Sequence, residues 1–227
     1  MPIRGVLFDF SGTLFRLEAD EVWLDAALRK AGAELDETVK ANLLDQLTTP
    51  TGHSVRLPDH LRDAWHRRDL DPALHHKIYR HVLNSFLEHD AAAEEIYAQL
   101  TSPANWFPYP DTADTLRHLR KTGIAVGVVS NIAWDIRDAF TRYDLREDVD
   151  AFVLSYEFGA MKPEASIFRH ACQAIGVPPD ACLMVGDSEV ADGGATALGT
   201  PLAVVEPLPT TRRPRALLDV LEAHDLR

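Results

Sequence analysis

Four groups of polar residues each follow a short apolar run, and together they could bind a phosphorylated molecule and a metal ion. The groups are Asp9, Ser11, Gly12 and Thr13; Ser130 and Asn131; Lys162; and Gly186, Asp187, Ser188 and Asp192. Carboxylate oxygens are ligands that Mg²⁺ prefers. A lysine with hydroxyl and backbone donors can balance the charge of phosphoryl oxygens. The set therefore favours phosphoryl chemistry assisted by a divalent metal.

Each group also has an ordinary structural explanation when it is taken alone. An aspartate after a strand often caps a helix, a Ser-Asn pair is common in turns, and a single lysine is usually a surface charge. The order of the groups is more informative, because every group stands at the end of an apolar run. In open α/β sheets, ligands bind beyond the carboxyl ends of the strands. We therefore expect the four groups to meet at one site.

The apolar runs are typical of strands in a parallel sheet that is covered on both faces. Each run is short, rich in Val, Ile, Leu or Phe, and lacks polar alternation. The predicted strands are Val6–Phe8, Ile124–Val129, Phe152–Leu154, Cys182–Val185 and Leu202–Val205. Helical patterns lie between them at Thr112–Thr122, Asp135–Tyr143, Glu164–Ile175 and Ala191–Leu198. This alternation predicts an α/β fold with right-handed crossovers.

Residues 16–105 have a different pattern, with no strand-like run. The predicted helices there are Glu18–Ala31, Asp36–Leu47, Leu57–Arg67, Pro72–Glu88 and Ala91–Leu100. We therefore expect an all-helical domain at residues 16–105, inserted into a core domain formed by residues 1–15 and 106–227. Most of the histidines and arginines of the insertion are expected on a solvated face, while one or two could reach an anionic substrate. The proline-rich stretch Pro201–Pro214 is expected to be mostly loop.

Composition narrows the classes of partner and compartment. The formal net charge of −12 disfavours nucleic acid and anionic membrane surfaces as partners, because both require Lys and Arg to meet phosphate. No apolar run reaches the roughly 18 residues of a membrane span, and the N-terminus lacks a signal-peptide pattern. The two cysteines, Cys172 and Cys182, form no CxxC pair or metal-ligand spacing. We predict a soluble cytoplasmic protein, and leave open whether it is a monomer or a homodimer.

The four groups resemble the motifs of the haloacid dehalogenase (HAD) superfamily of hydrolases. DFSGTL at Asp9–Leu14 is similar to the first motif, Ser130 to the second, Lys162 before Pro163 to the third, and GDSEVAD at Gly186–Asp192 to the fourth. The helical insertion is similar to the type 1 cap of subfamily I. The resemblance implies a Rossmann-like three-layer parallel sheet with the active site under an all-helical cap. It also implies Mg²⁺ as cofactor and a small phosphorylated molecule as substrate.

The resemblance also implies a role for each motif residue. Asp9 would be the nucleophile and would form an aspartyl–phosphate intermediate, which a carboxylate can do near neutral pH without losing a proton first. The residues implied to bind the phosphoryl group are Thr13, Ser130, Asn131 and Lys162, and those implied to hold Mg²⁺ are Asp9, the backbone carbonyl of Ser11, Asp187 and Asp192. Asp192 would act near the ion or through a water molecule. Lys162 would also balance the charge of Asp9.

Ser11 is a departure from the family pattern. Phosphatases of this family read DxDxT, and their second Asp protonates the leaving oxygen and then activates water. A serine hydroxyl holds its proton too tightly for this role, and general acid–base catalysis is typically worth about 10²–10⁴-fold in rate. The metal site need not suffer, because the implied ligand at this position is a main-chain oxygen.

Three functions remain compatible with Ser11, of which we favour the first. The chain is a Mg²⁺-dependent phosphatase that acts on a good leaving group or takes an acid from the cap, where His53 and His60 are candidates. Alternatively it catalyses another reaction of the superfamily, either dehalogenation or phosphonate hydrolysis. The latter would require a Schiff-base lysine, for which the insertion offers Lys30, Lys40 and Lys77. Dehalogenases do not need the metal, however, and this chain keeps both Asp187 and Asp192. The third possibility is a weakened relative that binds a phosphorylated ligand.

Overall fold

A computed structural model describes residues 2–48 and 57–227 of the chain. Its centre is a five-stranded parallel sheet with the strand order β5-β4-β1-β6-β7. The strands are β1 (Gly5–Phe8), β4 (Ala125–Ser130), β5 (Ala151–Leu154), β6 (Cys182–Gly186) and β7 (Leu202–Val204). All five predicted strands are confirmed within one or two residues at each end. Because β1 is the central strand, the residue that follows it lies between the ends of β4 and β6.

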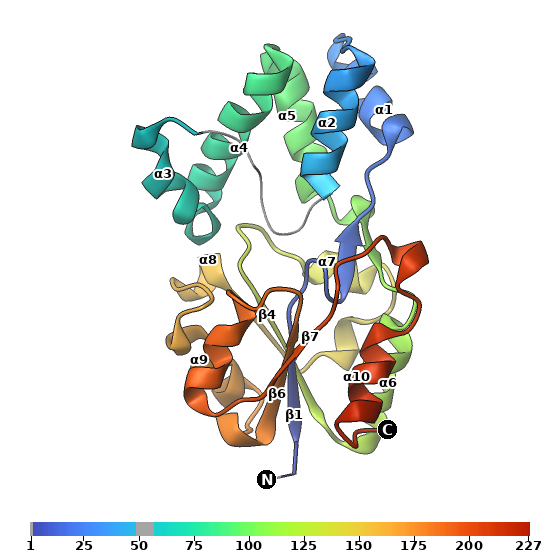
Figure 1. Ribbon diagram of the computed structural model, residues 1–227, viewed down its shortest axis with the longest axis vertical. Coiled ribbons are helices and arrows are strands. Elements are labelled where there is room, and N and C mark those ends of the chain that lie inside the picture. The colour runs from blue at the N-terminus through green and yellow to red at the C-terminus, as the bar shows by residue number, and fades with distance from the viewer. Residues whose placement is uncertain (1, 49–56) are drawn as a thin grey trace.

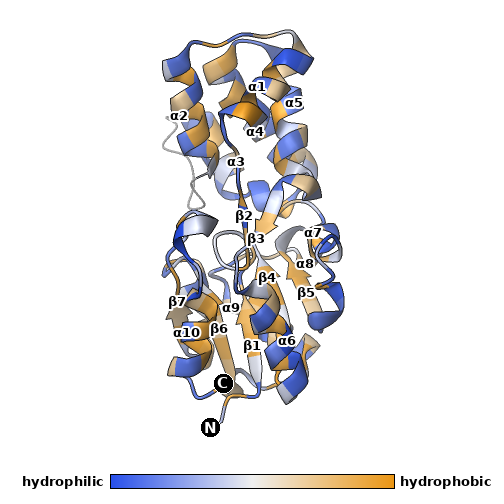
Figure 2. Cartoon of the chain, turned by 90° about the vertical axis from the view of Figure 1, so that its right-hand side faces the viewer, coloured by the Kyte–Doolittle hydropathy of each residue, from blue (hydrophilic) through white to orange (hydrophobic). Residues whose placement is uncertain are grey.

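Helices cover both faces of the sheet and complete three layers (Figure 1). Side chains such as Val6 and Phe8 pack with α6 (Thr112–Thr122) and α10 (Ala216–Ala223) on one face. Leu7 packs with α9 (Ala165–Ala174) on the other face. Figure 2 shows the apolar residues concentrated along the strands between these helices. The predicted Rossmann-like α/β core is confirmed.

Several elements differ from the predictions. The predicted helix Ala191–Leu198 is a 3₁₀ helix, η5 (Asp192–Leu198), and the predicted helix Asp135–Tyr143 is shortened to α7 (Arg137–Thr141). Helices α8 (Ser155–Phe158) and α10 were not predicted. The short 3₁₀ segments are η2 (Pro103–Asn105), η3 (Arg146–Asp148), η4 (Pro179–Ala181) and η6 (Thr210–Arg212).

The described residues of the insertion form five α-helices, grouped beyond the carboxyl end of the sheet (Figure 1). These helices are α1 (Glu21–Ala31), α2 (Glu37–Thr48), α3 (Asp59–His66), α4 (Pro72–Leu87) and α5 (Asp90–Thr101). Local sequence explains their limits: the Asp20 side chain accepts a hydrogen bond from the backbone N of Trp23, and Gly32 ends α1 at φ 69°. A 3₁₀ turn, η1 (Arg68–Leu70), joins α3 to α4. We refer to this helical group as the cap.

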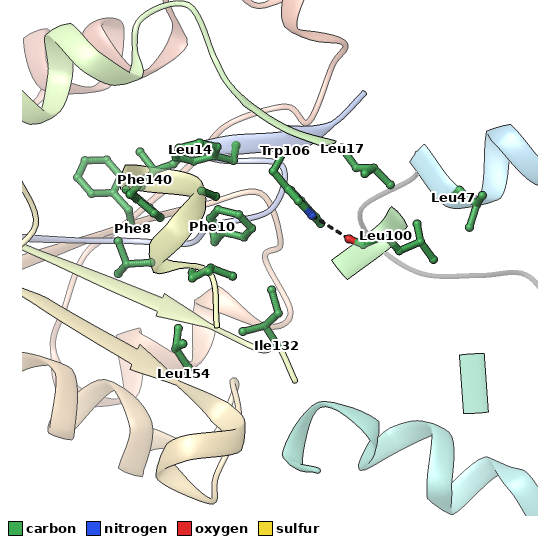
Figure 3. Packing of buried hydrophobic residues seen from close by; sticks show 14 of the residues in the cluster. Phe8, Phe10, Leu14, Leu17, Leu47, Leu100, Trp106, Ile132, Phe140 and Leu154 are labelled. Carbon is green, nitrogen blue, oxygen red and sulfur yellow. Dashed lines mark hydrogen bonds between the residues drawn. The ribbon is translucent and has the colours of Figure 1, made fainter. Parts of the chain in front are cut away.

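A two-stranded antiparallel ribbon connects the cap to the core, which was not predicted. Strand β2 (Phe15–Leu17) pairs with β3 (Trp106–Pro108), and β2 crosses the predicted domain boundary after residue 15. The division into residues 1–15 with 106–227 and residues 16–105 therefore remains a proposal, with β2 shared between the two parts. Figure 3 shows the aromatic packing at this connection, where the Trp106 indole donates a hydrogen bond to the Leu100 carbonyl.

Two further expectations concern the whole chain. Cys172 and Cys182 are both buried, and neither forms a disulfide. None of the helices in the described ranges is long and apolar enough to cross a membrane.

Candidate active site

Asp9 lies where the central strand ends, held by both backbone and side-chain contacts. Its backbone N donates to the Val185 carbonyl (2.9 Å), which extends the pairing of β1 with β6 by one residue. Its Oδ1 accepts hydrogen bonds from the Phe10 backbone N (2.7 Å) and from Lys162 Nζ (2.8 Å). Burial raises the pKa of the Asp9 carboxyl, and the Lys162 charge opposes this shift. The carboxylate is thus fixed in place and faces a cation.

Lys162 is a buried ammonium shared by two carboxylates. Its Nζ lies 2.8 Å from Asp9 Oδ1 and 2.6 Å from Asp192 Oδ1, and the residue is 3% exposed. Burial alone would lower the pKa of Lys162, but the charges of Asp192 and Asp9 raise it above its ordinary value. Lys162 is therefore a permanent positive charge at this site.

Asn131 holds the backbone of Lys162 from the end of β4. Its Nδ2 donates to the Lys162 carbonyl (2.9 Å) and its Oδ1 accepts from the Lys162 backbone N (2.7 Å). Both ends of the amide are used, so these contacts favour a positioning role. Its predicted contact with substrate stays a prediction.

Asp187 and Asp192 complete a cluster of three carboxylates. Asp9, Asp187 and Asp192 each offer an oxygen within 4.8 Å of the others. Burial raises the pKa of Asp187 to about 8, and the charges of Asp9 and Asp192 add to the shift. Asp192 is fully buried and accepts a hydrogen bond from the Ser188 backbone N (3.0 Å). One lysine does not balance three carboxylates, so the site is short of positive charge.

The glycines beside these carboxylates are required by close packing. A Cβ on Gly186 would overlap the carboxylate of Asp192. Gly12 has φ +73°, and a Cβ there would also collide with the carboxylate of Asp187. The loop after Asp9 can therefore pass close to Asp187 only because Gly12 lacks a side chain.

The donor set fits Mg²⁺. Three clustered carboxylates supply hard oxygen ligands, and their unbalanced charge, which shows in the raised pKa of Asp187, would be met by a divalent cation. Asp9, Asp187 and Asp192 would hold the ion. The Ser11 carbonyl, implied as a fourth ligand, stays a prediction.

Most of the predicted residues line one cavity of about 260 Å³ between the core and the cap. The core contributes Asp9, Ser11, Ser130, Asn131, Met161, Lys162, Asp187, Ser188 and Ala191, and the cap segment contributes His66, Arg68 and Asp69. Asp192 lies behind Lys162 and is not part of the lining. The cavity therefore brings together the strand-end groups that the sequence placed in four separate loops.

Thr13 differs from its prediction as a substrate ligand. It is 0% exposed and is not among the lining residues. Its hydroxyl has no hydrogen-bond partner among the described residues, while its carbonyl accepts from Arg213. Because the loop turns back toward β2 at this point, Thr13 belongs to the framework of the loop and not to the cavity wall.

None of the predicted cap candidates that the structure describes lines the cavity. His53 lies outside the described residues, and His60 is an exposed residue of α3. Lys30 and Lys40 form ion pairs with Glu95 and Asp25 elsewhere on the cap. Lys77 is also absent from the lining. The cap residues that do line the cavity are His66, Arg68 and Asp69. The sequence showed that the insertion is rich in histidine and arginine, but it singled out none of these three.

Arg213 is a site residue that the sequence did not reveal. From the segment after β7, its guanidinium donates to the Gly12 carbonyl (2.6 Å) and to the Thr13 carbonyl, and it lies over the Tyr109 ring. Burial lowers the pKa of Arg213 to about 10, and nearby Tyr109 and Asp111 oppose this shift. Arg213 stands about 200 residues from its partners in the chain, within a stretch expected to be loop. Arg213 stands beside Arg212 and Arg215 in the sequence, and nothing in that run shows which arginine reaches the loop after β1.

Comparison with known proteins gives a consistent result. A family model for haloacid dehalogenase-like hydrolases matches residues 3–197. The haloacid dehalogenase-like hydrolase domain-containing protein 3 of Mus musculus is 36% identical over 108 residues, which are 47% of this chain and 43% of the mouse protein. The match thus spans less than half the length of that relative. The glyceraldehyde 3-phosphate phosphatase of Methanopyrus kandleri is 30% identical over 190 residues, which are 82% of this chain and 76% of that protein.

The fold is shared with solved structures as well. The crystal structure of a dehalogenase superposes with a TM-score of 0.68, covering 97% of this chain and 96% of that chain at 20% identity. At this identity the likeness concerns the fold alone. The family match, in contrast, covers all four strand-end groups and the whole cavity lining. The chain therefore belongs to the haloacid dehalogenase-like hydrolase family.

Proposed function

We propose that this protein is a Mg²⁺-dependent phosphatase that acts on a small phosphorylated metabolite through an aspartyl–phosphate intermediate. The observation that carries the proposal is the cluster of Asp9, Asp187 and Asp192 beside Lys162, of which Asp9, Asp187 and Lys162 line one cavity. The phosphatase activity of the relative from Methanopyrus kandleri supports the same substrate class. We also propose that the protein is cytoplasmic.

The residues divide the work of phosphoryl transfer. Asp9 attacks phosphorus, since its carboxylate is fixed by the Phe10 backbone N and by Lys162. Lys162 and Ser130, both in the cavity lining, bind phosphoryl oxygens. Water then cleaves the aspartyl phosphate and releases inorganic phosphate. Bound Mg²⁺ would reduce the repulsion between the Asp9 carboxylate and the anionic substrate.

The other two reactions are less well supported by the site. A dehalogenase has no need for a metal, yet the three-carboxylate cluster is complete. A phosphonate hydrolase that uses a Schiff base needs a cap lysine in the cavity, and among the described lining residues the only lysine is Lys162 of the core. A binding protein without turnover would not need Asp9 to be held against Lys162 in an oriented position.

The test is cleavage of p-nitrophenyl phosphate with and without Mg²⁺. We expect turnover that requires Mg²⁺ and that is lost in Asp9→Asn, which keeps the side-chain shape but removes the nucleophile. Asp138→Asn, at an exposed position of α7, is the matched control and should retain activity. Metal-independent release of halide from a 2-haloacid, without phosphatase activity, would contradict the proposal.

A further inference from the structure

We propose that Asp69 of the cap is the general acid and base that Ser11 cannot provide. This inference rests on the proposed phosphatase function and adds a residue to it. Ser11 lines the cavity two residues after Asp9, but a serine hydroxyl cannot release its proton near neutral pH. Asp69 lines the same cavity from the cap side, as a carboxyl group on a different element. The cap therefore supplies a carboxyl group to the same cavity that Asp9 and Ser11 line.

The position of Asp69 relative to the core is fixed by a hydrogen bond. The Ser155 hydroxyl, on α8 at the end of β5, donates to the Asp69 carbonyl (2.6 Å). The same hydroxyl accepts from the backbone N of Ile132 (2.9 Å), in the loop that carries Ser130 and Asn131. Asp69 is thus linked through the Ser155 hydroxyl to the loop that carries Ser130 and Asn131. Without this hydrogen bond, the position of Asp69 relative to the core would not be fixed.

The surroundings of Asp69 suit a proton donor. Its side chain is 10% exposed, with Arg68 NH2 3.5 Å from Oδ2 and His75 Nε2 3.8 Å from Oδ1. His75 is itself buried, and its Nδ1 lies 2.9 Å from the Tyr97 hydroxyl. Burial raises the pKa of Asp69, and the Arg68 charge opposes the shift. A carboxyl that keeps its proton can donate it, as buried catalytic acids do.

The other polar groups around the cavity are less suited to the role. The charged and titratable groups that line it with Asp69 are Asp9, His66, Arg68, Lys162 and Asp187. Arg68 does not lose its proton in a protein, and Lys162 is held between two carboxylates. His66 is exposed at the end of α3. Among the described cap residues of the lining, Asp69 is the only one that is both buried and anchored to the core.

The proposed steps balance in atoms and protons. As Asp9 forms its bond to phosphorus, the bond from phosphorus to the leaving oxygen breaks, and the Asp69 proton moves to that oxygen to give an alcohol. Asp69, now a carboxylate, takes a proton from water, whose oxygen attacks phosphorus. The bond between phosphorus and Asp9 breaks, and inorganic phosphate leaves. Asp69 is protonated again and Asp9 is again a carboxylate.

The experiment compares two leaving groups in wild type and Asp69→Asn. Ethyl phosphate needs a proton on its leaving oxygen, so we expect its kcat to fall by about 10²–10⁴-fold in Asp69→Asn. p-Nitrophenolate leaves without a proton, so its first turnover should keep the wild-type rate. Hydrolysis of the aspartyl phosphate then lacks Asp69 as its base. A burst of nitrophenolate equal to the enzyme concentration should therefore precede slow turnover. Asp63→Asn, on the exposed face of α3, is the matched control without effect.

Further variants make the outcome decisive. The double variant Ser11→Asp/Asp69→Asn should recover turnover of ethyl phosphate, because an acid is restored at the position where it usually stands in the family. A uniform loss on both substrates without a burst, or no loss at all, would overturn the role of Asp69. The same burst in His66→Gln, with Asp69→Asn unaffected, would assign the role to His66 instead. Failure of the proposed function looks different, since wild type itself would then cleave neither phosphate.

Discussion

At the scale of single residues, the site is dominated by an excess of negative charge. Asp9 and Asp192 both contact the ammonium of Lys162, and Asp187 lies in the same largely buried cluster of carboxylates. Such an arrangement is unfavourable unless a proton or a cation binds it. The requirement for a cation at these three carboxylates is therefore a stronger argument for metal-dependent chemistry than any single sequence motif.

The pKa of Asp187 predicts how Mg²⁺ stabilises the protein. The carboxyl has a pKa of about 8 in the folded, metal-free chain, against about 4 when unfolded. Between these values the native state binds a proton that the unfolded state does not, so stability without metal falls as pH rises through this window. Mg²⁺ displaces that proton, and we expect it to raise Tm more at about pH 8.5 than at about pH 6.

The measurement is thermal unfolding with and without Mg²⁺ at both pH values. In Asp187→Asn the metal-free protein should lose most of the pH dependence in this range, and Mg²⁺ should have little effect at either pH. An equal Mg²⁺ shift at both pH values in the wild type would mean that Asp187 does not exchange a proton for the ion.

Lys162→Met should destabilise the fold as well as abolish turnover. The substitution leaves two buried carboxylates without their cation, and breaking a buried ion pair in this way costs about 3–5 kcal/mol. Chemical denaturation checks the effect. Arg137→Met, which breaks the more exposed pair with Glu157, is the control and should cost about 0–1 kcal/mol. An equal loss of unfolding free energy in Lys162→Met and Arg137→Met would argue against a buried charge cluster that depends on Lys162.

At the scale of elements, the loop after β1 is held from two sides. Phe10 and Phe15 flank the loop and stack at 5.2 Å, and they pack on Trp106 and Phe140 respectively. Arg213 fixes the carbonyls between them from the segment after β7. The loop geometry therefore depends on an element far away in sequence.

Arg213→Lys should separate positioning from binding. Lysine keeps the charge but cannot donate to two carbonyls in the fork geometry of arginine. We expect kcat to fall by about 10²-fold through misplacement of Asp9 and its loop, with KM changed little, because Lys162 and Ser130 remain. Steady-state kinetics on p-nitrophenyl phosphate measure both kcat and KM. A rise in KM at constant kcat would instead place Arg213 in substrate binding.

The sequence predicted the sheet well because buried parallel strands are uninterrupted apolar runs, as in Cys182–Val185. It missed β2 and β3 because three-residue strands carry no periodic signal and pair across about 90 residues of cap. No prediction covered α10, which begins two residues after the proline-rich stretch Pro201–Pro214 ends. The strand-end residues were found together because parallel strands end at one edge. Asp69 and Arg213 were not found from the sequence. Their hydrogen-bond partners, Ser155 and Gly12, lie 86 and about 200 residues away in the chain.

At the scale of the whole molecule, the cap completes the cavity that the core begins. The ribbon of β2 and β3 joins the two parts covalently, and the hydrogen bond from Ser155 to the Asp69 carbonyl links them across the cavity. Core residues supply the nucleophile, the cation and the metal ligands, while the cap supplies the remaining wall. We therefore expect catalysis to depend on the position of the cap relative to the core as well as on the core motifs.

Ser155→Ala tests this dependence. Loss of the hydroxyl leaves the Asp69 carbonyl and the Ile132 backbone N without their partner, which should cost about 1–3 kcal/mol of stability. If Asp69 must be held in place to donate its proton, the rate of the first turnover should fall more for ethyl phosphate than for p-nitrophenyl phosphate. A parallel fall in the first-turnover rate for both substrates would show that the contact supports the fold without positioning an acid.

The central claim is that Asp9 carries the phosphoryl group during turnover. The most direct measurement is mass spectrometry of the peptide that contains Asp9, after acid quenching of the enzyme during turnover of p-nitrophenyl phosphate with Mg²⁺. We predict a phosphoryl adduct on Asp9 in Asp69→Asn, where hydrolysis is slowed, and no adduct in Asp9→Asn. Sustained Mg²⁺-dependent turnover with no adduct on Asp9, or with the adduct on another residue, would contradict it.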